Sequence, residues 1–181
     1  MATPVTSIEE TEAALLAKDG PSYELVDGEL RERNVSFQSS RIAGFVMTVL
    51  GSHVRANRLG SVTDSELGIR IFDDPMTTRK ADVAFISAAR APRGDQGFLR
   101  VAPDLVVEVV SPGDKASEVR AKVDEWLHAG VRLVWVVYPE AREVHVYPAE
   151  GRASILSGDD QLTGGDVVPG FTCGVAAFFP E

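Results

Sequence analysis

The segment that most constrains the fold is an apolar run from Leu105 to Val110 with one glutamate, Glu108, inside it. Aliphatic and β-branched neighbours at this density predict a strand that is buried on both faces of a sheet. A carboxylate in such a strand loses its hydration, which is costly unless other groups replace the water. We therefore expect a metal ion, a basic side chain or a retained proton to compensate Glu108.

Length and composition limit the classes of protein that fit. The 181 residues suit one domain over 1–181, and 44% hydrophobic with 25% charged residues is typical of a soluble globular chain. No apolar run is long enough to cross a membrane, and residues 1–7 lack the features of a signal peptide, so we expect a cytoplasmic protein. The single cysteine, Cys173, excludes an internal disulfide and a thiolate metal cluster. A net charge of -9 argues against a broad basic surface for nucleic acid, although it leaves room for a local groove.

Periodicity and turn residues predict an α/β domain with a mixed central sheet. An Asp27-Gly28 pair between two strand-like runs indicates a hairpin with a type I′ turn. The other predicted elements are a helix after a capping box at Ser7 that ends near Gly20, a helix from about 39 to 57, strands at 67–73, 82–86 and 105–110, a helix at 114–129, and strands at 131–138 and 143–147.

Two carboxylates and a lysine form the candidate site. Asp82 opens one predicted strand and Glu108 lies within the next, so both can converge on one Mg²⁺ (or Mn²⁺) ion. Asp104 shares a face with Glu108, but four strand residues span roughly 13 Å, and Asp104 is better placed to cap the strand. Lys122 borders the apolar face of the following helix and can direct its ammonium at the two acids. This combination suits phosphodiester hydrolysis.

Other assignments stay open from the residues alone. Glu108 could be a structural acid paired with a buried cation, and Lys115 competes with Lys122 for the lysine role. Glu24 could reach the site from the hairpin, and Glu66 could add a third acid from a neighbouring strand.

Several stretches together resemble the Uma-two family, whose members are described as restriction-type endonucleases of the PD-(D/E)XK superfamily. The resemblance covers the chain from about Tyr23 to Phe179. It rests on residues 23–30 (YELVDGEL), 81–86 (ADVAFI), 103–112 (PDLVVEVVSP), and the segment from Lys122 through Gly130-Val131 to Trp135 and Tyr138-Pro139.

The resemblance implies a restriction-endonuclease-like αβββαβ core, here preceded by an N-terminal helix and a hairpin. It places the family's metal-binding acids at Asp82 and Glu108 and its helical lysine at Lys122. Val110 stands where most of the superfamily carries a lysine, two residues after the glutamate. Two positions depart from the family pattern: Ala81 replaces the usual proline, and Gln38 or Ser39 stands where a histidine is common.

The functional expectation is a Mg²⁺-dependent endonuclease that acts on DNA. An inactive nuclease-fold module that binds a protein or nucleic acid partner is the alternative, because a fold does not guarantee activity. Hydrolysis of RNA or of single strands is not distinguished from the first expectation by these residues. A double-strand cut needs two active sites, so we also expect a homodimer, for which the apolar tail 175–179 could supply surface.

Overall fold

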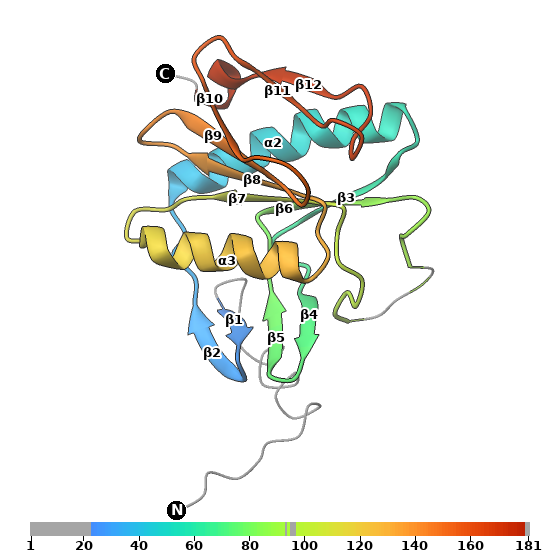
Figure 1. The fold of residues 1–181 in the computed structure, drawn as a ribbon, viewed down its shortest axis with the longest axis vertical. Coiled ribbons are helices and arrows are strands. Elements are labelled where there is room, and N and C mark those ends of the chain that lie inside the picture. The colour runs from blue at the N-terminus through green and yellow to red at the C-terminus, as the bar shows by residue number, and fades with distance from the viewer. Residues whose placement is uncertain (1–22, 93, 95–96, 180–181) are drawn as a thin grey trace, which may run out of the picture.

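The structure is a computed structural model that describes residues 23–92, 94 and 97–179. The helix predicted between Ser7 and Gly20 lies outside these residues. Two sheets and two long helices make up most of the described chain (Figure 1).

The central sheet has six strands in the order β10-β9-β8-β7-β6-β3. Its β7 and β8 run parallel and the other neighbouring pairs run antiparallel, so the predicted mixed sheet is confirmed. The strands are β3 (Gly60–Asp64), β6 (Val83–Ser87), β7 (Leu105–Val109), β8 (Leu133–Tyr138), β9 (Glu143–Pro148) and β10 (Ser154–Ser157).

One helix covers each face of this sheet, α2 (Phe37–Ala56) on one side and α3 (Ala116–His128) on the other (Figure 1). Side chains of β7 point alternately to the two faces of the sheet, and this decides which of them pack against each helix. Leu105, Val107 and Val109 belong to the core under α2, whereas Val106 packs in the core under α3. Because side chains alternate along a strand, Glu108 faces α3 together with Val106.

A smaller sheet with the order β2-β1-β5-β4 carries the hairpin. It joins β1 (Tyr23–Val26), β2 (Glu29–Glu32), β4 (Ile69–Asp73) and β5 (Met76–Arg79). Asp27 and Gly28 have φ angles of 52° and 78°, as a type I′ turn requires, so the predicted hairpin is confirmed. Figure 1 shows this sheet below the central one, with β1 and β2 beneath the α3 layer.

Before residue 151, two strands, β3 and β5, were not among the predicted elements, and each has a physical reason. β3 has a weak pattern, with Gly60, Ser61 and Thr63 among its five residues, and it forms the edge of the sheet beside β6. β5 consists of Met, Thr, Thr and Arg, which reads as polar, yet all four residues are buried because β1 and β4 flank the strand. Tertiary pairing, rather than hydrophobic alternation, defines both strands.

The C-terminal segment packs beside α2 on the same face of the central sheet, where the Phe171 ring lies 5.6 Å from that of Trp135 on β8, centroid to centroid. It contains β11 (Gln161–Thr163), β12 (Thr172–Gly174) and a short 3₁₀ helix, η1 (Val175–Phe178). Val175, Phe178 and Phe179 are buried in the same core cluster as the inner face of α2. The chain therefore covers these apolar residues itself, and they offer no apolar surface for a second copy.

Candidate active site

A cavity of about 310 Å³ opens between the hairpin, the adjoining ends of β6 and β7, and α3. Charged side chains dominate its wall. The lining residues with ionisable side chains are Glu24, Arg31, Glu32, Arg33, Arg79, Asp82, Glu108, Asp114, Glu118, Lys122 and Glu125. Asp82, Glu108 and Lys122, the three residues expected to form a site, all lie on this wall.

The pairing of β6 with β7 brings the two acids together. Val83 is opposite Val107, and extending this antiparallel register by one residue puts Asp82 opposite Glu108 on the face toward α3. Asp82 also accepts a hydrogen bond at its Oδ2 atom from the Val109 backbone N–H at 2.7 Å. That bond fixes one carboxylate oxygen of Asp82 beside the strand that carries Glu108.

Helix α3 supplies both donors to Glu108. The Lys122 Nζ atom lies 2.9 Å from Glu108 Oε2, and the Trp126 indole Nε1–H donates to Oε1 at 2.8 Å. Lys122 and Trp126 are one turn apart, so they project from the same face of α3. Both carboxylate oxygens of Glu108, which is only 8% exposed, therefore have a partner.

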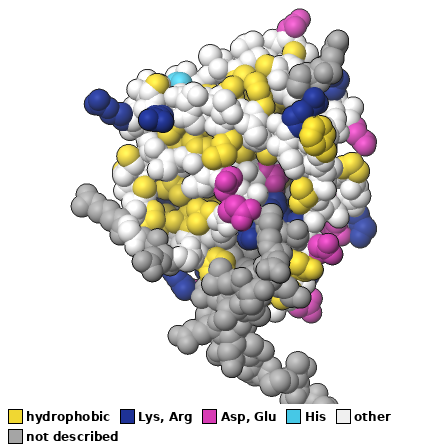
Figure 2. Space-filling model, turned by 180° about the vertical axis from the view of Figure 1, so that it is seen from behind, with side chains coloured by type: hydrophobic (Ala, Val, Ile, Leu, Met, Phe, Trp, Pro, Cys, Tyr) yellow, Lys and Arg dark blue, Asp and Glu magenta, His cyan; other side chains and the backbone are white. Residues whose placement is uncertain are grey.

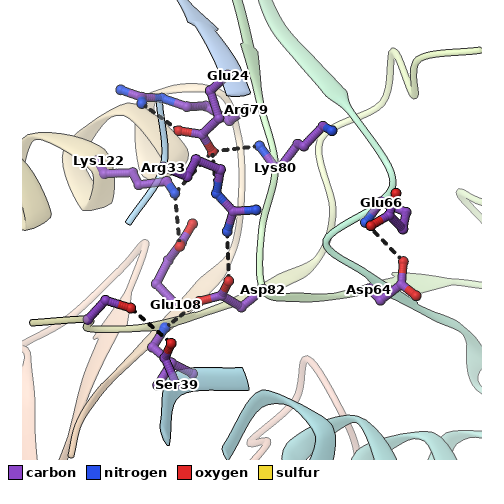
Figure 3. A network of polar contacts seen from close by, with 12 residues as sticks. Glu24, Arg33, Ser39, Asp64, Glu66, Arg79, Lys80, Asp82, Glu108 and Lys122 are labelled. Carbon is purple, nitrogen blue, oxygen red and sulfur yellow. Dashed lines mark hydrogen bonds and ion pairs between the residues drawn. The ribbon is translucent and has the colours of Figure 1, made fainter. Parts of the chain in front are cut away.

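The hairpin contributes Glu24, a buried carboxylate in contact with the side chains of Lys122, Arg79 and Arg33. Its Oε1 atom is 3.1 Å from Lys122 Nζ and accepts the Lys80 backbone N–H at 2.8 Å. Its Oε2 atom accepts a hydrogen bond from Arg79 Nη1 at 3.0 Å. Figure 3 shows Glu24 above Glu108, with the Lys122 ammonium directed at the latter. Glu24 thus joins the site, which the sequence left open.

Arg33 links the hairpin to the other acid. Its Nη2 atom donates to Asp82 Oδ1 at 2.7 Å, and its Nε atom lies 3.7 Å from Glu24 Oε1. In Figure 3 the guanidinium points down from the hairpin level to Asp82. Its side chain is 9% exposed.

The pKa of Glu108 is raised to about 7. Burial is the largest cause, because it penalises the charged carboxylate, and the negative charges of Asp82 and Glu24 add to it. Lys122 and Arg33 act in the opposite direction without overcoming these effects. Glu108 can therefore exchange a proton near neutral pH.

Glu24 behaves in the opposite way, although it is equally enclosed. Burial alone would raise its pKa, but the positive charges of Lys122, Arg79 and Arg33 and the Lys80 N–H lower it to about 2. Glu24 is consequently ionised at neutral pH and holds the cations around it.

The alternative candidates lie elsewhere. Lys115 is exposed and pairs with Glu118 at 3.0 Å. Glu66 is exposed and is not on the cavity wall. Asp104 is buried at the start of β7, where it accepts the Ser87 N–H at 2.8 Å and pairs with Arg90 at 2.9 Å, as expected of a residue that anchors the strand.

Sequence reasoning did not single out Arg33, Arg79 or Trp126 as site residues. Nothing in the spacing of Arg33 and Arg79 marks them, because they reach the site through tertiary packing, whereas Trp126 follows Lys122 by one helical turn and shares its face of α3. Ser39, one of two residues at the position where the family often has histidine, is buried in α2 and accepts a hydrogen bond from Ser111 at 2.9 Å.

The wall of the cavity is not broadly basic, since seven of the ionisable residues that line it are acidic and four are basic. On the face shown in Figure 2, Lys and Arg side chains are scattered and do not merge into a continuous patch. Among the described residues, no group of three or more His, Cys, Asp or Glu side chains gathers to hold a metal ion. In that same part of the chain, no helix has the length and apolar character needed to cross a membrane.

Comparisons with known proteins agree on family and fold. The model of the Uma2 family, described as "Putative restriction endonuclease", matches residues 8–176. A crystal structure from Anabaena variabilis ATCC 29413, described as a "putative nuclease belonging to DUF820", aligns with a TM-score of 0.81 at 20% identity, over 97% of this chain and 98% of that chain. That likeness confirms the nuclease-like α/β fold. No curated protein matches the chain.

Proposed function

The chain belongs to the Uma2 family, and from this premise we propose that it is a Mg²⁺-dependent endonuclease that hydrolyses DNA phosphodiester bonds. One observation carries the proposal. Lys122 lies 2.9 Å from Glu108, in a cavity whose wall also presents Asp82 from the opposite strand position. Two acids that can bind a metal ion and a lysine that can stabilise negative charge, side by side in one cavity, are what phosphodiester hydrolysis requires.

The donor set fits a hard divalent ion. Asp82 and Glu108 offer oxygen ligands on the same face of the sheet, and the cavity beside them has room for water molecules. Mg²⁺ usually keeps several waters and takes only one or two carboxylates from the protein. The lack of a third His, Cys, Asp or Glu beside the pair, within the described residues, therefore suits Mg²⁺ or Mn²⁺ better than a fully protein-ligated ion.

Each residue then has a distinct part. Asp82 and Glu108 would hold the cation, which would polarise the phosphate and lower the pKa of an attacking water. Lys122 would stabilise the negative charge that develops on the phosphate oxygens. Glu24 positions Lys122 through the 3.1 Å contact, so that the ammonium lies between both carboxylates. Hydrolysis adds one water across the P–O bond and yields a phosphate monoester and a hydroxyl end.

A specific observation also supports the inactive-module alternative. The acids of the site are already paired with Arg33, Arg79 and Lys122, so the network is satisfied without a metal. A self-contained buried network of this kind can serve folding alone.

Plasmid nicking separates the two functions. Supercoiled DNA would be incubated with wild type, Glu108→Ala and Lys115→Ala in Mg²⁺ or Mn²⁺. We expect cleavage by wild type and Lys115→Ala and none by Glu108→Ala. Equal cleavage by all three would assign the activity to a contaminant, and no cleavage of single- or double-stranded DNA would favour the binding module.

For double-strand cleavage we propose a homodimer, because one cavity of this kind addresses one strand. Light scattering at micromolar concentration measures this directly. A mass of 19.5 kDa that does not change with DNA and metal would limit the protein to nicking.

A further inference from the structure

Arg33 contacts the carboxylate of Asp82, which we propose as a ligand of the divalent ion. Its Nη2 atom is 2.7 Å from Asp82 Oδ1, while Oδ2 is already bound to the Val109 N–H. A cation that binds an oxygen of Asp82 would therefore come close to the positive guanidinium at Oδ1 or share Oδ2 with a backbone hydrogen bond. The guanidinium is the exchangeable partner, since the backbone bond ties Asp82 to β7.

The carboxylates of the site are paired with cations before any metal arrives. The buried Glu24 and Glu108 and the half-buried Asp82 face Arg33, Arg79 and Lys122, and Glu125 also pairs with Arg79, at 2.6 Å. A divalent ion would add two positive charges within a few ångströms of Arg33. In a partly buried site that repulsion is only weakly screened, so binding of the ion favours a rearrangement of these charges.

Arg33 is placed to make that change. It follows β2, whose last residue is Glu32, and precedes Ser36, which caps α2, so its backbone belongs to neither element. Asn34 holds this connection in place by donating to Asp114 at 3.0 Å. The guanidinium can thus leave Asp82 without breaking a strand or a helix, and Glu24, 3.7 Å away, keeps it at the cavity.

We infer that Arg33 is an internal counter-cation of the metal site: it holds Asp82 in the metal-free protein, releases it to a divalent ion, and then contacts a phosphate of the nucleic acid substrate. The inference rests on the proposed function, because it assumes that Asp82 is a metal ligand. It implies that metal and substrate bind cooperatively, since the phosphate supplies the negative charge that the displaced guanidinium needs.

The first test is Mn²⁺ affinity without nucleic acid, measured by calorimetry on wild type, Arg33→Gln and Arg33→Lys. Removing the competing charge should tighten Mn²⁺ binding by Arg33→Gln about tenfold. Arg33→Lys keeps the cation and should stay near wild type. Circular dichroism and thermal unfolding of each variant establish that it is folded.

Arg31→Gln is the matched control. Arg31 lines the same cavity wall and carries the same charge, but no contact with Asp82 is among its described interactions. A general effect of net charge would change Mn²⁺ affinity equally in both variants. A role specific to Arg33 leaves Arg31→Gln close to wild type.

The second test is binding of an oligonucleotide in Ca²⁺, which we use as a probe ion, and in EDTA. Arg33→Gln should bind the DNA several-fold more weakly than wild type in Ca²⁺ and with a smaller salt dependence, because one phosphate contact is lost. In EDTA the two proteins should bind alike, because Arg33 is then held by Asp82.

The outcomes separate this inference from the proposed function. Metal-dependent cleavage by wild type, together with unchanged or weaker Mn²⁺ binding by Arg33→Gln, would overturn the inference and leave the nuclease proposal standing. Mn²⁺ binding by Arg33→Gln but not by wild type would support the inference even if no DNA were cut. Failure of both proteins to bind Mn²⁺ would refute both.

Discussion

Trp126 donates its indole N–H to Glu108 at 2.8 Å, so the largest side chain of the α3 core is also a hydrogen-bond partner of the site's central carboxylate. Trp135, on β8 in the core under α2, is just as fully buried, yet within the described chain its indole nitrogen has no hydrogen-bond partner. The environments of the two tryptophans therefore differ in one hydrogen bond. Comparing substitutions at the two positions isolates what that bond contributes to stability.

Trp126→Phe should lower the free energy of unfolding by about 2 kcal/mol more than Trp135→Phe. Each change removes similar apolar volume, but only the first removes a hydrogen bond to a carboxylate, which contributes roughly 1.5–3 kcal/mol. Urea unfolding monitored by far-UV circular dichroism gives both values. Equal losses would mean that the Trp126 contact adds nothing beyond packing.

Lys122→Met should destabilise the protein by about 3–5 kcal/mol, because it leaves Glu24 and Glu108 enclosed without their shared cation. Adding Glu108→Gln to this variant should restore part of the loss, since one unpaired acid is then neutral. Lys115→Met, at an exposed pair, should change stability by less than about 0.5 kcal/mol. A loss in Lys122→Met that Glu108→Gln leaves unchanged would refute this account.

Glu24 should make the fold sensitive to acid. Its folded pKa, about 2, lies below the ordinary value of 4.5, so its contribution is complete above pH 4.5 and is lost as the pH falls toward 2. The difference in unfolding free energy between wild type and Glu24→Gln should be about 3 kcal/mol at pH 7 and shrink below pH 4. Urea titrations across this range provide the check. A difference independent of pH would show that Glu24 acts through packing rather than charge.

Glu108 should show the opposite sign. Its folded pKa, about 7, lies above 4.5, so its protonated form stabilises the fold fully below pH 4.5, and this contribution is lost as the pH rises through 7. Glu108→Gln should therefore gain stability relative to wild type between pH 5 and 8. Chemical unfolding of both proteins at several pH values measures the trend. A relative loss over that interval would place the pKa of Glu108 below its ordinary value instead.

The sequence by itself determined the main framework. The apolar run around Glu108 specified a doubly buried strand, the Asp27-Gly28 pair specified a hairpin, and helical spacing specified α2 and α3. These signals are local: periodicity and turn chemistry act within a few residues, so they can be read along the chain. Asp82, Glu108 and Lys122 also emerged, because each stands out against its immediate neighbours or matches a family motif.

Only the tertiary structure decided what surrounds those three residues. Arg33 and Arg79 come from the hairpin connection and from β5, a strand whose sequence looks polar, and both reach the site because the small sheet packs against α3 and the ends of β6 and β7. The same packing gives Glu24 and Glu108 different pKa values. Burial would raise both pKa values, but Glu24 has three cations and a backbone N–H around it and its pKa falls to about 2, whereas Glu108 also has two neighbouring carboxylates and its pKa rises to about 7. Such balances depend on distances between residues far apart in the chain, which spacing along the sequence does not encode.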